Sequence, residues 1–257
     1  MRIILFTLFL FSIIQSNAAD YYWVGGGGNW NDYNSHWALS SGGIPGNAGG
    51  VNVVPSPFDN VFFDANSGFT PTNNTVTINV PTIFCKNMDW TGATNFPNFI
   101  STQGENSTWN VYGSITFIPS MTFFFDGTIH FLAANQFHHI TSANQHFDGK
   151  LWFDGMSSRW AMQDSMSANI VELIEGDFVS NGHAIRVDTF MAATISQTLD
   201  TLDLSNSNIY MYDEASRFII NARVNNSTPT AQVLLTTNLH HTNFYYNYDL
   251  QLTESRC

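Results

Sequence analysis

The sequence predicts an all-β protein, a right-handed parallel β-helix with a loop-rich N-terminal cap. Three observations predict this fold class: short segments that alternate apolar and polar residues, an internal repeat, and very little helical periodicity. Alternation is typical of a strand that buries one face, and a repeated unit of this size buries that face by stacking on its neighbours. A solenoid of stacked coils satisfies both requirements.

The internal repeat is the most direct of these observations. The sequence FDGTIHF at 125–131 recurs as FDGKLWF at 147–153, an offset of 22 residues, and looser copies occur at 112–117 and 175–179. Each copy begins with a turn and continues as an alternating strand, so its apolar positions are expected on one face. A period of this length predicts one coil per repeat.

Corners between strands need residues that accept a left-handed backbone, and asparagine does so more readily than most. Asparagines at equivalent corners can also form hydrogen-bonded ladders from coil to coil. The residues expected in this role are Asn144, Asn181, Asn206 and Asn208.

A β-sandwich is the alternative fold. It would join its strands in hairpins, and the chain contains Asp-Gly sequences that are typical of hairpin turns. These sequences begin at Asp126, Asp148 and Asp154.

The chain divides into three segments by composition. Residues 1–18 form a predicted signal peptide, residues 19–73 a cap rich in glycine, asparagine and tryptophan, and residues 74–257 the coils of the β-helix. Within the coils, alternating strands are expected at 75–80, 108–112, 114–118 and 208–212. The ending at Cys257 has no capping pattern, which fits coils that are truncated at the C-terminus.

The first 18 residues have the three parts of a secretory signal. Arg2 is followed by a largely apolar run at 3–14 and then by small residues, so cleavage is expected after Ala18 or Ala19. The run is short for a spanning helix, although a retained N-terminal anchor is the alternative. No later segment has the run of about 18 apolar residues that a spanning helix needs. We therefore expect a protein that is secreted or located at the cell surface.

Composition narrows the class of partner. The net charge of −12 repels phosphates and anionic lipids, which disfavours nucleic acid as a partner. Only 11% of residues are charged and 15% are aromatic, so the chain is expected to fold. Its two cysteines are too few for a disulfide framework, and Cys85 is expected to be a small buried residue; a bridge to Cys257 is the alternative.

The cap carries a motif of tryptophan and glycine, WVGGGGNW at 23–30, followed by HW at 36–37 and PFDNVFFD at 57–64. Together with 176–183 and 201–207, these residues resemble exported, repetitive, β-helical surface proteins of Bacteroidota-type bacteria. Many members of that group are adhesin-like, and many are delivered by the type IX route. The resemblance implies a β-helical surface protein and implies no catalytic residues. This chain has no recognisable C-terminal sorting domain, so the export route stays open.

A β-helical polysaccharide lyase or hydrolase is the alternative function. Such a site needs several carboxylates around a metal, together with an Arg or Lys base. The candidate residues are Asp148, Asp154, Asp164, Glu172, Glu175, Asp177, Asp200 and Asp203, with Arg159 and Arg186 as bases. No spacing singles these residues out, and acidic residues at turns are usually solvated or capping groups. We therefore favour a non-catalytic role.

No metal or other cofactor is predicted. Asp59, Asp64 and Asn66 have oxygens that suit calcium, but the dense acidic loop of a calcium site is missing, so the two aspartates are expected to be turn residues. The adjacent histidines, His138-His139 and His240-His241, would point to opposite faces of a strand and could not chelate one metal. For His130 and His146, which approach only if adjacent coils align, a surface or stacking role is expected.

Three tryptophans, Trp109, Trp152 and Trp160, are the candidates for a sugar-stacking platform if they are exposed. Packing in the core is the commoner fate of tryptophan in a solenoid of this composition. The favoured function is an exported structural or adhesive module without a chemical step, whose β-helical rod contacts carbohydrate or other cell-surface components. A β-sandwich carbohydrate-binding module would keep the same partner on a different scaffold.

Overall fold

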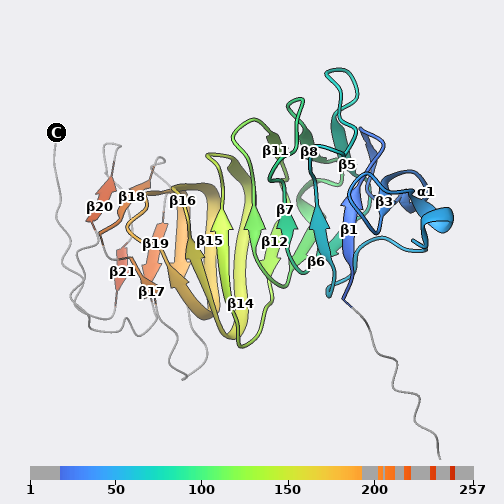
Figure 1. Cartoon of the computed structure of the whole chain (residues 1–257). Helices are drawn as coiled ribbons and strands as arrows, with labels where there is room; N and C mark the ends of the chain where they lie inside the picture. The colour runs from blue at the N-terminus through green and yellow to red at the C-terminus, as the bar shows by residue number, and fades with distance from the viewer. Residues whose placement is uncertain are drawn as a thin grey trace, which may run out of the picture.

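The structure of the chain, a computed structural model, describes residues 18–192, 202–204, 206–211, 217–220, 232–235 and 244–246. Figure 1 shows its strands stacked beside one another in chain order, from the blue N-terminal end to the red C-terminal end. Nearly all strand pairings are parallel, and they join each strand to the corresponding strand of the next coil. The fold is therefore the predicted parallel β-helix.

Each coil contributes strands to three faces, and we name each face by one buried residue. The Ile129 face consists of β6 (Thr82–Cys85), β9 (Thr108–Val111), β12 (Thr128–Phe131), the middle of β14 (His146–Met162) and of β15 (Met166–Val179), the end of β16 (Ile185–Ala192), β19 (Arg217–Ile220) and β21 (Phe244–Tyr246).

The other two faces follow the same order. The Ile115 face consists of β1 (Asp20–Trp23), β4 (Asn60–Phe62), β7 (Met88–Asp89), β10 (Ile115–Thr116), β13 (Phe137–Thr141), the ends of β14 and β15, and β17 (Leu202–Asp203). The Phe99 face consists of β2 (Gly28–Asn29), β5 (Thr75–Ile78), β8 (Asn98–Ser101), β11 (Thr122–Phe124), the starts of β14, β15 and β16, β18 (Asn208–Met211) and β20 (Gln232–Leu235).

The register of β12 on β14 confirms that the closer repeat is one coil. Ile129 pairs with Leu151, and Phe131 pairs with Phe153, at an offset of 22 residues. The two phenylalanine rings stack with centroids 4.6 Å apart and planes 4° from parallel. The looser copies do not continue this column: the strand at 115–116 lies on the Ile115 face, and the end of the copy at 175–179 lies there too.

The β-sandwich alternative is wrong because the Asp-Gly sequences do not close hairpins. Among the described strands, the pairing of β1 with β3 (Trp37–Ala38) is the only antiparallel one. Gly127 and Gly149 instead lie at stacked corners, where a Cβ on Gly149 would lie 1.8 Å from the Gly127 carbonyl oxygen. These glycines let the backbones of successive coils approach each other.

The core is a continuous apolar column inside the coils. On the Ile129 face it contains, in successive coils, Trp109, Ile129, Leu151, Val171 and Phe190, each at most 1% exposed. Burying a large apolar side chain contributes about 1.5–3 kcal/mol, so stacking of the coils supplies the main stabilisation.

The corners use asparagine as predicted at three of the four positions. Asn144, Asn181 and Asn206 have φ angles of 62°, 52° and 58°, whereas Asn208 lies within β18. A side-chain ladder forms elsewhere, where Asn87 donates to Asn60 Oδ1 at 2.7 Å and Asn60 donates to Asp20 Oδ1 at 2.8 Å.

The tryptophan-rich opening closes the N-terminal end of the core. Trp23, Trp30 and Trp37 are fully buried, and Trp37 contacts the other two edge to face at centroid distances of 5.0 and 4.8 Å. Parallel pairing already starts at β1, so the predicted cap segment is built into the first coils. It also contains the one-turn helix α1 (Tyr33–His36) and the 3-10 helix η1 (Gly46–Gly49); a second 3-10 helix, η2 (Gly104–Asn106), lies further along the coils.

The glycines of the motif make room for His36. Its ring stacks on Trp23 at 4.5 Å and 2° from parallel, and its Nδ1 lies 2.9 Å from the Val24 carbonyl oxygen. A Cβ on Gly28 would lie 1.8 Å from His36 Nε2, so this position requires glycine. The pattern GNW followed by HW is thus a packing motif of the cap.

Several predicted features lie outside the described residues. They are residues 1–17 of the predicted signal peptide, Asp200, the pair His240-His241 and Cys257. Within the part that the structure describes, no helix is long and apolar enough to cross a membrane.

Candidate functional site

A row of polar side chains follows the outside of β14. Because neighbours along a strand point to opposite faces, burial of Phe147, Leu151 and Phe153 turns the residues between them outward. We call this row the β14 strip, and it consists of His146, Asp148, Lys150, Trp152 and Asp154. It starts on the Phe99 face, crosses a corner and runs along the Ile129 face.

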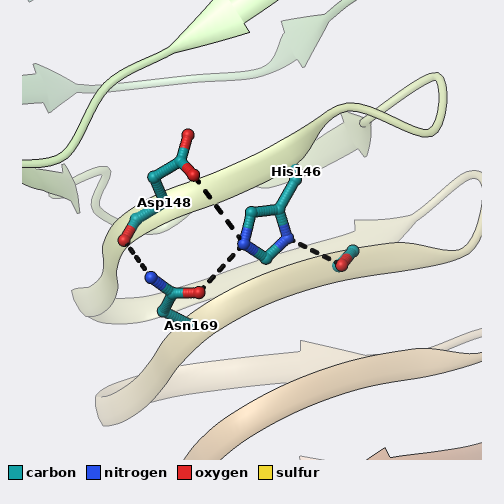
Figure 2. A network of polar contacts seen from close by, with 4 residues as sticks. His146, Asp148 and Asn169 are labelled. Atoms are coloured by element: carbon teal, nitrogen blue, oxygen red, sulfur yellow. Dashed lines mark hydrogen bonds and ion pairs between the residues drawn. The ribbon is translucent and has the colours of Figure 1, made fainter. Parts of the chain in front are cut away.

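His146, at one end of the strip, is held by side chains of the next coil (Figure 2). Its Nδ1 lies 2.8 Å from Ser167 Oγ, and its Nε2 lies 2.9 Å from Asn169 Oδ1. Asn169 Nδ2 donates to the Asp148 carbonyl oxygen, which fixes the amide so that its oxygen faces the ring. His146 Nε2 therefore donates to Asn169 Oδ1, and Nδ1 faces the Ser167 hydroxyl.

The same contacts contain the residue types of a nucleophilic triad, but their geometry is not that of one. The nearest Asp148 carboxylate oxygen is 4.0 Å from His146 Nε2. Ser167 pairs in the sheet with His146 on one side and Arg186 on the other, so the backbone amides of this strand take part in the sheet. An oxyanion would need free, converging amides, which this flat strand does not offer.

Trp152 lies in the middle of the strip and is contacted by two charged or polar groups. The His130 ring stacks on it with centroids 4.4 Å apart, and Lys150 Nζ lies 4.4 Å from its ring centroid. Lys150 also donates to Glu172 Oε2 at 3.1 Å. These contacts fix the orientation of the partly buried indole on the outer face.

Ionisable groups along the strip occur in pairs. His130 Nε2 lies 3.5 Å from Asp154 Oδ2, with side chains 16% and 33% exposed. Burial lowers the pKa of His130, and the neighbouring Asp154 opposes this shift. Lys150 pairs with Glu172, whereas Asp148 and Asp154 each lie beside a histidine, so the strip is a surface of hydrogen-bonding groups with more carboxylates than cations.

Two of the three tryptophans considered for a sugar-stacking platform pack in the core instead. Trp109 and Trp160 are fully buried, and Trp109 donates its indole N–H to Cys85 Sγ at 3.3 Å. Both occupy inward positions of their strands and pack in the core, so they cannot stack on a glycan. Trp152 alone of the three faces outward.

The candidate carboxylates that the structure describes do not gather at one point, although Asp154 and Glu175 pair in the sheet. Asp164 accepts from the backbone of Ser142 at 2.8 Å and of Ala143 at 2.5 Å, so it caps a corner. Glu172 lies on the Ile129 face, whereas Asp177 lies on the Ile115 face. The candidate bases lie over aromatic rings, Arg159 over Phe137 and Arg186 over Tyr210. Within the described residues, no three His, Cys, Asp or Glu side chains gather as a metal site.

The remaining predicted residues have structural roles. Asp59 and Asp64 act as turn residues: Asp59 accepts from Ser56 N, and Asp64 accepts from Asn66 N, each at 2.8 Å. His138 is buried and His139 is exposed, which confirms that adjacent histidines point to opposite faces. His130 and His146 do not meet, because His130 aligns with Trp152.

Cys85 is the small buried residue that the sequence predicts. It is a free thiol with no exposed surface. Burial raises the pKa of its thiol to about 12, and the hydrogen bond from Trp109 opposes this shift.

Two residues of the site, Ser167 and Asn169, are not apparent from the sequence. They meet His146 because β15 stacks on β14. The number of residues between paired positions differs from one pair of coils to the next, so the sequence does not show which residues of two coils are neighbours. Alternation within 166–170 was the available signal, since it places both residues on the outer side.

Neither a family model, nor a curated protein, nor a solved structure matches this chain. Its function is therefore inferred from its own geometry, and in particular from the β14 strip.

Proposed function

We propose that this chain is an exported, non-catalytic module of a cell surface, whose stacked coils form a rod that holds a neutral carbohydrate on its outer face. The β-solenoid supports the rod in this proposal, because parallel pairing joins successive coils and a continuous apolar core runs through them. A repetitive rod of this kind presents side chains at fixed spacings along its length.

The β14 strip is the observation that carries the choice of ligand. Carbohydrates offer hydroxyl groups that donate and accept hydrogen bonds, together with apolar C–H surfaces that suit an aromatic ring. The strip combines a fixed indole, Trp152, with a carboxylate on either side, at Asp148 and Asp154. Because the carboxylates of Asp148, Asp154 and Glu172 face a single lysine, Lys150, and the whole chain is acidic, a neutral polysaccharide suits the strip better than a polyanion.

The export part of the proposal is supported by the sequence before the first strand. A basic residue, an apolar run and small residues stand ahead of Ala19, in the order of a secretory signal. The WVGGGGNW motif resembles exported surface proteins, and in the structure it closes the end of the solenoid.

Binding to a polysaccharide panel tests the proposal. Purified protein without residues 1–18 is applied to immobilised neutral and acidic polysaccharides, and both retention and newly formed chain ends are measured. We expect retention by at least one neutral polysaccharide, no retention by polyuronates and no cleavage. Cleavage by the purified protein would overturn the non-catalytic role.

Two variants locate the contact. Trp152→Ala is expected to weaken retention about tenfold, because an aromatic contact at the centre of the strip is lost. Phe137→Ala is the matched control, since Phe137 is 54% exposed but lies on the Ile115 face. Equal loss in both variants, or unchanged retention in Trp152→Ala, would exclude the β14 strip as the binding surface.

A further inference from the structure

Asp59 is a buried carboxylate at the start of the solenoid. It is 6% exposed, and its two oxygens accept hydrogen bonds from Ala19 N and Ser56 N, each at 2.8 Å. Among the described residues, no salt bridge joins it to a Lys, Arg or His side chain. A buried carboxylate is costly unless a positive charge or several hydrogen bonds compensate it. Within the described residues, the hydrogen-bond donors to the Asp59 carboxylate are thus two neutral backbone amides.

Ala19 is the point at which the chain joins the fold. Its amide donates to Asp59, its carbonyl oxygen accepts from Asn60 N at 2.9 Å, and Asp20 begins the parallel pairing of β1 with β4. Ala18, one residue earlier, is exposed. A chain that began at Asp20 would lose both hydrogen bonds of Ala19.

The sequence around this point distinguishes the two expected cleavage positions. Signal cleavage needs small residues one and three positions before the cut bond. Cleavage after Ala18 places Ala18 and Ser16 at these positions, whereas cleavage after Ala19 places the larger Asn17 three positions before the bond. The local sequence and the hydrogen bonds of Ala19 therefore favour the same bond.

We propose that a signal peptidase cuts between Ala18 and Ala19, and that the new α-ammonium of Ala19 forms an ion pair with Asp59. The proposal rests on the export part of the proposed function. Hydrolysis adds one water molecule across the peptide bond, so Ala18 leaves with a carboxylate and the Ala19 nitrogen becomes an ammonium. That nitrogen already lies 2.8 Å from Asp59 Oδ1, so cleavage turns a neutral hydrogen bond into a charge-assisted one. Maturation thus supplies the cation that the buried carboxylate lacks.

Thermal unfolding of proteins with defined N-termini tests the ion pair. Four forms are compared: a chain starting at Ala19, the same chain with an acetylated amine, a chain starting at Ala18, and a chain starting at Asp20. Acetylation keeps the N–H donor and removes the charge, so the free Ala19 form is expected to melt about 2–4 °C higher. The form starting at Asp20 is expected to melt lowest. Equal midpoints for the free and acetylated forms would overturn the ion pair.

Asp59→Asn completes this comparison as a double-mutant cycle. It removes the carboxylate charge, so the difference between the free and acetylated forms is expected to disappear. Any loss of the Ser56 hydrogen bond is common to both forms and cancels. If the free and acetylated forms of Asp59→Asn still differ in melting temperature, the charged amine acts through a group other than the Asp59 carboxylate.

The cleavage site is tested by the intact mass and N-terminal sequence of full-length protein expressed in a secreting bacterial host. We expect the exported product to begin at Ala19. Ala18→Leu is expected to block cleavage, whereas Ala19→Leu, the matched control, is expected to be cut. An exported product that begins elsewhere would overturn this inference alone. An uncut product that stays inside the cell would overturn the export part of the proposed function as well. Binding to polysaccharide does not affect either result.

Discussion

His130 stacks on Trp152 across two successive coils, with ring centroids 4.4 Å apart and planes 10° from parallel. The two residues occupy the same position in the repeats at 125–131 and 147–153, and they pair directly in the sheet. The repeat thus places an outward column of flat side chains beside the inward column of Phe131 and Phe153. The His130 ring covers one face of the indole and Lys150 Nζ also lies over the ring, so a ligand would contact the surface of Trp152 that these two groups leave uncovered and the neighbouring polar groups.

We expect the His130–Trp152 stack to contribute a coupling free energy of about 1 kcal/mol, as measured for other aromatic pairs. Urea unfolding of His130→Ala, Trp152→Ala and the double variant gives this quantity as the departure from additivity. Additive losses in the double variant would mean that the rings lie together without stabilising each other. A cycle between Trp152 and Phe137, which lie on different faces, is the control and is expected to give no coupling.

The repeat predicts part of this arrangement. Because neighbours along a strand point to opposite faces, inward positions for Leu151 and Phe153 require Trp152 to point outward. The alternation is therefore enough to place Trp152 outside the core. The inward position of Trp109 follows from its pairing with Ile129 at an offset of 20 residues, which differs from the offset of 22 in the next coil. Because corner lengths vary, the sequence alone does not align side chains from different coils, and the contact of His146 with Ser167 could not be predicted.

The Cys85 thiol is expected to be unreactive in the folded protein. It has no exposed surface, and burial raises its pKa to about 12, so the thiolate that reacts with alkylating reagents is nearly absent at pH 8. Labelling with iodoacetamide, carried out in a Cys257→Ser background, is expected to modify Cys85 only after guanidinium is added. Rapid modification under native conditions would show that the core opens around β6.

His138 is expected to make the fold sensitive to mild acid. It is 4% exposed and packs near Trp160, and no hydrogen-bond partner of its Nε2 is present among the described residues. Burial, and secondarily His139 and Lys86, lowers its pKa from 6.5 to about 4. The unfolded chain therefore takes up a proton first as the pH falls below about 6.5. The resulting loss of stability is expected to reach about 3 kcal/mol near pH 4 and then to level off.

The difference between wild type and His138→Leu isolates this contribution, because the carboxylates and His130 titrate in both proteins. Unfolding free energies measured in urea from pH 7 to pH 4 are expected to fall more steeply for the wild type. Identical slopes for the two proteins would show that His138 is protonated at no cost in the folded state.

Gly28 is expected to be the most sensitive glycine of the tryptophan motif. An alanine Cβ at this position would lie 1.8 Å from His36 Nε2, so the imidazole would have to leave its stack on Trp23. Overpacking of this kind costs about 1–3 kcal/mol, and the loss is expected in Gly28→Ala as a lower urea midpoint. Gly104→Ala is the control: its Cβ would meet nothing within 4 Å, so only its φ of +67° opposes alanine, at about 1–2 kcal/mol. Recovery of stability in Gly28→Ala combined with His36→Ala would identify the clash with the ring as the cause, whereas an equal loss with and without the ring would place the requirement for glycine in the backbone.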